Sequence, residues 1–158
     1  MTTLVADVML SKLARWLRLS GTSVEDVRFS DDDRIIKYVK EKKAILLTAD
    51  EALAQRSKKQ GFKVLLVKEG SIEEQLAFVA KSLGLNISAC PSSICTYCNA
   101  PLERIKKEDA VKYVPEHVAK RYRAFYKCPK CGRVYWHGTH WLAISKKLEK
   151  ARKLESKI

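Results

Sequence analysis

The sequence lacks any run of about 18 consecutive apolar residues, the length that a membrane-spanning helix needs. Its first residues, Met1 to Asp7, also lack the basic segment and the cleavage site of a secretory signal. These absences predict a cytoplasmic protein with no membrane partner.

Acidic residues are scarce in the second part of the chain. Residues 91–158 carry 16 Lys and Arg against 6 Asp and Glu, a net charge of +10, whereas residues 1–90 carry 15 against 12. This asymmetry indicates a polyanionic partner, because Lys and Arg release counterions when they neutralise nucleic-acid phosphates. Nucleic acid is the leading candidate. A membrane surface and a basic face that only confers solubility are the alternatives.

The five cysteines do not form the pattern of a disulfide framework. Four of them make two CxxC motifs, Cys95–Cys98 and Cys128–Cys131, which are separated by 29 residues. In a cytoplasmic chain this pairing favours metal over disulfides, and four thiolates are the tetrahedral ligand set of a structural zinc ion. A redox CxxC motif is the alternative. The fifth cysteine, Cys90, is expected to be a structural thiol.

Short apolar runs alternate with amphipathic segments through the first 90 residues. Strands are predicted within residues 4–9, 22–29, 44–48 and 62–67, and helices over 11–20, 32–41, 51–60 and 72–83. Repeated strand–helix units predict an α/β domain with a mainly parallel sheet covered by helices. We expect three parts: this domain over residues 1–90, a zinc-binding segment over 91–141 and a basic helix over 142–158.

Two of the predicted strands are followed by an acid. Asp7 and Asp50 would lie side by side if their strands are neighbours, because open α/β sheets gather ligands at the carboxyl ends of strands. Carboxylate oxygens bind magnesium or manganese, which activates water for attack on a phosphodiester. A third acid could come from the start of the next helix, which carries Asp31, Asp32 and Asp33. The alternative is that Asp50 and this trio only cap helices, and that Asp7 is a turn residue.

The sequence resembles the Mut-type C-terminal RNase domain family in the order and spacing of several segments. These are residues 7–18, 45–50 and 74–76, the two CxxC motifs, and residues 131–140. The resemblance covers roughly residues 4 to 141. It implies a PIN-like fold, a three-layer parallel sheet flanked by helices, followed by a small zinc ribbon, and metal-dependent cleavage of RNA.

The resemblance also assigns site residues. Asp7 and Asp50 fall on the family's two strand-end acids, and Asp32 falls best on its helix-start acid, with Asp31 and Asp33 as alternatives. A fourth acid is often present in PIN-like nucleases, and either Glu51 or Glu74 could supply it.

Basic and aromatic residues predict where RNA would bind. Arginine can grip a phosphate with two parallel hydrogen bonds, and aromatic rings stack on unpaired bases. The candidates are Lys12, Arg15, Arg56, Arg133, Tyr135, Trp136, His137 and His140. Solvated helix faces and aromatic packing within the ribbon are the alternatives, and a general acid–base role is a further one for the two histidines.

The sequence therefore predicts a metal-dependent endoribonuclease that needs structural zinc and either magnesium or manganese. A second interpretation is an RNA- or ribosome-binding protein with a weak or inactive nuclease domain, and an rRNA-maturation factor lies between the two. A PIN-type toxin is a weaker alternative, because the chain has a ribbon and no evident antitoxin-binding segment.

Overall fold

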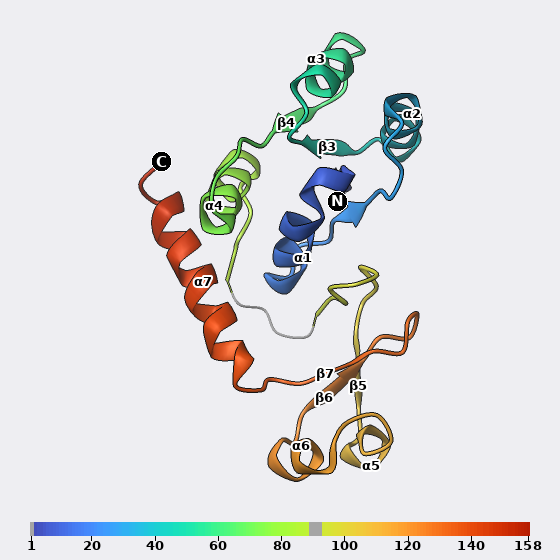
Figure 1. The fold of residues 1–158 in the computed structure, drawn as a ribbon, viewed down its shortest axis with the longest axis vertical. Coiled ribbons are helices and arrows are strands. Elements are labelled where there is room, and N and C mark those ends of the chain that lie inside the picture. Colours follow the sequence, from blue (N-terminus) through green and yellow to red (C-terminus); the bar gives the residue numbers. More distant parts are fainter. Residues whose placement is uncertain (1, 89–92) are drawn as a thin grey trace.

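The computed structural model describes residues 2–88 and 93–158, so Cys90 lies outside the described residues. A four-stranded parallel sheet has the order β2-β1-β3-β4, and a three-stranded antiparallel sheet has the order β5-β6-β7 (Figure 1). The strands are β1 (Leu4–Ala6), β2 (Glu25–Asp26), β3 (Ile45–Thr48), β4 (Val64–Leu66), β5 (Glu103–Ile105), β6 (Phe125–Lys127) and β7 (Val134–Tyr135).

Helices alternate with the strands of the parallel sheet, as the sequence predicts. They are α1 (Ser11–Leu19), preceded by the short 3-10 helix η1 (Val8–Leu10), α2 (Asp32–Lys42), α3 (Glu51–Lys59) and α4 (Ile72–Leu83). Local signals set the ends of α4. The Ser71 hydroxyl accepts a hydrogen bond from the Glu74 backbone, and Gly84 ends the helix in the left-handed conformation.

The parallel sheet lies between two layers of helices. On one face, Leu4, Ala6 and Leu47 pack with the buried residues of α1 and α4. On the other face, Val5 and Leu46 pack with those of α2 and α3. Successive residues of a strand point to opposite faces, so these short strands need to be apolar throughout. The α/β class and its parallel sheet are thereby confirmed.

Strand β2 is shorter than the predicted 22–29 segment. The Val24 carbonyl accepts two hydrogen bonds from the Arg18 guanidinium, and the Val24 N–H donates to the Asn99 side chain at 3.0 Å. Side chains therefore take the groups that a longer strand would use for pairing, and only Glu25 and Asp26 join the sheet.

The segment between the two CxxC motifs has a small core of its own. It contains β5, the helices α5 (Lys107–Ala110) and α6 (Glu116–Arg121), and β6. Phe125 is fully buried there, packed with residues of α5 and α6. Pro115 is the N-cap residue of α6.

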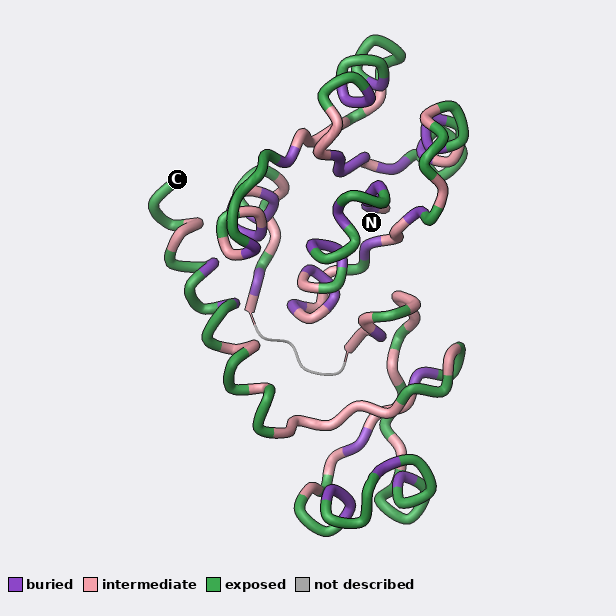
Figure 2. The backbone as a smooth tube through the Cα atoms, in the orientation of Figure 1, coloured by how far each residue is buried: buried purple, intermediate pink, exposed green. Residues whose placement is uncertain are grey.

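Helix α7 (His140–Glu155) begins two residues before the predicted segment and runs alongside α4 (Figure 1). Leu148 and Ala151 are buried in the core that α1 and α4 share, whereas the basic residues of α7 are exposed (Figure 2). Within the described residues, no helix has both the length and the hydropathy of a membrane span.

Candidate carboxylate site and cysteine cluster

Asp7 and Asp50 follow neighbouring parallel strands. β1 pairs directly with β3, with Ala6 opposite Leu47, and the helices after these strands, α1 and α3, cover opposite faces of the sheet. Such a reversal is a topological switch point, where α/β sheets form ligand-binding crevices at the carboxyl ends of their strands. The adjacency on which the carboxylate prediction depends is therefore present.

Asp7 is almost completely buried, with 3% of its surface exposed. One carboxylate oxygen accepts a hydrogen bond from the Met9 N–H at 3.0 Å, and the other accepts one from the Thr48 hydroxyl. Burial raises the pKa of Asp7 above its ordinary value, and the Asp50 charge adds to the rise, although the two hydrogen bonds oppose it. A buried acid of this kind is typical of functional sites.

Thr48 connects the two acids. Its hydroxyl donates to Asp7 and accepts a hydrogen bond from the Asp50 N–H at 3.0 Å. The Asp50 carboxylate also caps α3 by accepting from the Leu53 N–H at 3.1 Å, so the prediction that Asp50 caps a helix is confirmed. Sequence reasoning did not select Thr48, and its place two residues before Asp50 was the available signal.

The acids at the start of α2 are held elsewhere. Asp31 caps the helix by accepting from the Asp33 N–H at 3.0 Å, and Asp33 forms an ion pair with Arg56 of α3. Arg56 also lies 4.0 Å from the Asp32 carboxylate. Across residues 2–88 and 93–158, no three carboxylates bring oxygens within 4.8 Å of one another. The structure thus links Asp7 to Asp50 through Thr48 and links Asp32 and Asp33 to Arg56, whereas Asp31 caps its helix.

The two candidates for a fourth acid lie in the first turns of helices that follow β3 and β4. Glu51 opens α3 and is exposed. Glu74 packs over Gly70, where an added Cβ would lie 2.9 Å from the Glu74 carboxylate. Both residues therefore belong to the carboxyl edge of the sheet, but neither is a hydrogen-bond partner of Asp7.

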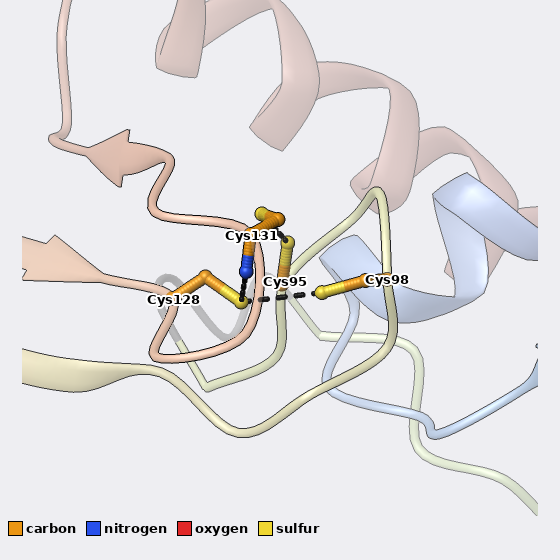
Figure 3. A group of neighbouring side chains, drawn as sticks. All are labelled: Cys95, Cys98, Cys128 and Cys131. Carbon is orange, nitrogen blue, oxygen red and sulfur yellow. Dashed lines mark hydrogen bonds between the residues drawn. The ribbon is translucent and has the colours of Figure 1, made fainter.

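The four paired cysteines form a compact cluster (Figure 3). All their sulfur atoms lie within 4.8 Å of one another, with 3.7 Å between Cys95 and Cys131 and 3.2 Å between Cys98 and Cys128. A tetrahedral zinc site with Zn–S bonds of about 2.3 Å has sulfur atoms roughly 3.8 Å apart. The cluster is compatible with zinc in number, type and spacing of ligands.

The two CxxC turns share one backbone pattern. The Asn99 N–H donates to the Cys95 carbonyl, and the Gly132 N–H donates to the Cys128 carbonyl, both at 2.9 Å. Asn99 and Gly132 both have positive φ, 64° and 78°, which suits their residue types. Two equivalent turns therefore present the four thiols from opposite sides of the cluster.

Arg18 ties the cysteine segment to the parallel sheet. It is 2% exposed, its guanidinium donates to the Thr96 carbonyl at 2.9 Å, and it pairs with Asp26 of β2 at 2.7 Å. Sequence reasoning missed this role. Its signal was a basic residue four positions after Ala14, on the buried side of α1.

Several predicted RNA contacts are exposed and basic. Lys12 and Arg15 project from α1, and Arg133 lies over the Tyr97 ring with its guanidinium carbon 3.7 Å from the centroid. Arg56 differs, because Asp33 and Asp32 hold its guanidinium.

The aromatic residues near the second CxxC motif pack against one another and against the cysteines. The Tyr135 hydroxyl lies 3.0 Å from the Cys95 sulfur, and burial with this neighbour raises the pKa of Tyr135 to about 12. His137 stacks on Tyr126 and tilts against Trp141, with ring centroids 6.0 and 5.0 Å apart. Burial and the nearby His140 lower the pKa of His137, which favours the neutral ring.

No curated protein and no solved structure matches this chain significantly. The family model described as the Mut7-C RNAse domain, in contrast, matches residues 2–148, which include the carboxylate pair, the cysteine cluster and most of α7. The chain therefore belongs to the Mut7-C RNAse domain family.

Proposed function

We propose that the protein is a metal-dependent endoribonuclease with a PIN-like catalytic domain and a zinc ribbon. The observation that carries this proposal is the pairing of Asp7 and Asp50 through Thr48 at the switch point of the parallel sheet. Membership of an RNase domain family supports RNA as the substrate or partner.

The two acids differ in burial and in the hydrogen bonds that orient them. The hydrogen bonds from Thr48 and the Met9 N–H fix the Asp7 carboxylate, and burial keeps it poorly solvated. The Asp50 carboxylate is more exposed and is oriented by its cap. Together they offer hard oxygen ligands for magnesium or manganese, which when bound would activate water and stabilise the leaving oxygen. Asp32 remains the proposed third acid, within reach of Arg56.

The cysteine cluster would hold a structural zinc ion, because four thiolates leave no open position for a reacting water. The zinc would stabilise the segment that carries Arg133 and the aromatic residues. With Lys12 and Arg15 of α1 and the exposed basic side of α7, this segment would bind RNA.

Cleavage of a labelled single-stranded RNA in the presence of manganese or magnesium tests the proposal. We expect Asp7→Asn and Asp50→Asn to abolish cleavage while the folded proteins still bind RNA, because the amide is a poor ligand for these cations. Glu41→Gln is the matched control, an exposed carboxylate at the end of α2, and it should cleave as the wild type does. Full metal-dependent cleavage by both aspartate variants would rule out this catalytic site.

A second candidate function is RNA or ribosome binding without cleavage, and the pairing of Arg56 with Asp33 favours it. Arg56 engages Asp33 and lies 4.0 Å from Asp32, and no three carboxylates gather around one point among the described residues. Arg56→Gln should release Asp32 and increase cleavage if Asp32 completes the site. Salt-sensitive RNA binding by this variant and by the wild type, with no cleavage at any manganese concentration, would support the binding function instead.

A further inference from the structure

A cavity between α1 and the cysteine-containing segment gathers all three tryptophans of the chain. Trp16 comes from α1, Trp136 follows β7, and Trp141 lies in the first turn of α7. We call it the tryptophan cavity. Its volume of about 360 Å³ lies within the range of roughly 300–1,000 Å³ typical of small-ligand pockets.

The walls of the tryptophan cavity are ordered by close packing. His137 is held between Tyr126 and Trp141 by ring contacts. At Gly138, an added Cβ would lie 3.1 Å from both the Trp136 indole nitrogen and the His140 ring, so a larger residue would push these two side chains by a few tenths of an ångström. Close packing of this kind limits the rotamers of the cavity walls, which lowers the entropic cost of binding.

A second cleft continues from the tryptophan cavity toward the carboxylate pair. The two share Arg15, Trp16, Arg18 and Thr96 in their walls. The second cleft, of about 630 Å³, extends past Lys12 and Ser11 to Val8, the residue directly after Asp7. We call the continuous depression the α1 groove, because this helix forms its length.

The α1 groove is positively charged. Lys12, Arg15 and Trp16 lie at i, i+3 and i+4 on one exposed face of α1, and Arg28 joins them in the wall. The Lys147 ammonium lies 5.5 Å from the centre of the Trp16 ring. Asp26 is the acid among the lining residues, and it is paired with Arg18.

We propose that the α1 groove binds single-stranded RNA, with one unpaired nucleobase in the tryptophan cavity and the neighbouring phosphates on Lys12 and Arg15. Proteins bind single-stranded nucleic acid by stacking its bases on aromatic rings and by lining the path of its phosphates with basic residues. The strand would then continue to the end of the groove at Val8, the residue next to Asp7. The inference deepens the proposed ribonuclease function and rests on it for the direction of the strand.

The three tryptophans provide the test, because every one of them lines the same cavity. The zinc-loaded protein, without added magnesium or manganese, is titrated with an oligouridylate of about 12 nucleotides, a length that spans a typical single-strand site. We expect strong quenching of tryptophan fluorescence by the single strand, and much weaker binding of an RNA duplex of the same length.

Two variants with matched controls locate the contact. Trp141→Ala should weaken oligouridylate binding about tenfold and Trp141→Phe much less, because a phenyl ring still stacks on a base. Leu142→Ala is the control, since Leu142 is 68% exposed and does not line the cavity. Arg15→Glu should weaken binding and reduce the slope of log affinity against log salt by about 1. Its control is Lys81→Glu, a charge reversal on an exposed residue of α4.

The outcomes separate this proposal from the nuclease proposal, because binding is measured without cleavage. If the wild type never cleaves RNA but Trp141→Ala and Arg15→Glu both lose binding, the groove proposal is supported and the nuclease proposal is refuted. Equal affinity of Trp141→Ala and Leu142→Ala, or RNA binding without a fluorescence change, would overturn the groove. Saturation of the fluorescence signal by an acidic peptide but not by RNA would assign the groove to a protein partner and also overturn the proposal.

Discussion

The Thr48 hydroxyl donates a hydrogen bond to the Asp7 carboxylate in the interior of the sheet, where both residues are buried. Replacing Thr48 with valine keeps the shape and removes the donor. We expect Thr48→Val to lower the free energy of unfolding by about 1–3 kcal/mol at neutral pH, because it leaves one oxygen of a buried carboxylate without its donor. Urea unfolding measures this loss. Thr2→Val, at an exposed position, should change stability by less than about 0.5 kcal/mol.

The same substitution should act through the pKa of Asp7. Burial already raises this pKa above 3.8, so folding favours the protonated acid, and stability falls as the pH rises from 3.8 through the folded-state pKa. Thr48→Val removes a hydrogen bond that lowers this pKa. The loss of unfolding free energy that it causes should therefore grow as the pH rises from 3.8 through the folded-state pKa. In an Asp7→Asn background the cost should be independent of pH. An equal cost at every pH in both backgrounds would contradict the coupling.

Arg18 provides the second prediction, since its guanidinium joins α1, β2 and the first CxxC turn. Lysine keeps the charge but cannot form the same set of hydrogen bonds. We expect Arg18→Lys to cost about 3 kcal/mol of unfolding free energy, because an ammonium group cannot reach Asp26 and the Val24 and Thr96 carbonyls together. Arg15→Lys, on the exposed side of the same helix, is the control for urea unfolding. Equal stability of the two variants would show that the buried contacts of Arg18 contribute little.

Local sequence patterns predicted which segments form the strands and helices of the parallel-sheet domain, but they did not predict which of these segments contact one another. The apolar run before Asp50 identified β3, and the helical stripe after Asp7 identified α1, because each pattern lies within a few residues. That β1 lies beside β3 depends on packing between segments about 40 residues apart. The family resemblance, more than periodicity, led to the pairing of Asp7 and Asp50.

Side-chain interactions between distant segments limited the rest of the prediction. The short β2 follows from the contacts of Val24 with Arg18 and Asn99, and the sequence around Val24 shows neither. The ion pair between Arg56 and Asp33 likewise joins two helices whose relative placement no local pattern defines. The cysteine cluster was predictable because two CxxC motifs are by themselves the ligand pattern of a zinc site.

The third prediction concerns metal content. The purified protein should contain one zinc ion per chain, and removing it with a strong chelator should unfold β5–β7, whose core is small. The parallel sheet should remain, but the Val24 amide should exchange with solvent faster, because its acceptor is the Asn99 side chain beside Cys98. Hydrogen exchange followed by mass spectrometry or NMR measures both effects. Unchanged protection of Val24 after zinc removal would contradict this coupling between the two parts.

The fourth prediction concerns the imidazole of His137. Its pKa lies below 6.5, first because the ring is partly buried and then because His140 is close. The unfolded chain therefore binds this proton more readily, so the stability that neutral His137 contributes is complete above pH 6.5 and is lost as the pH falls through the folded-state value. His140→Asn should raise the titration midpoint of His137 but leave it below 6.5, because the ring stays partly buried. NMR titration of the three imidazoles measures it, with exposed His117→Asn as the control. A midpoint above 6.5 in the wild type would mean that a cationic His137 is stabilised, and would favour a direct phosphate contact over aromatic packing.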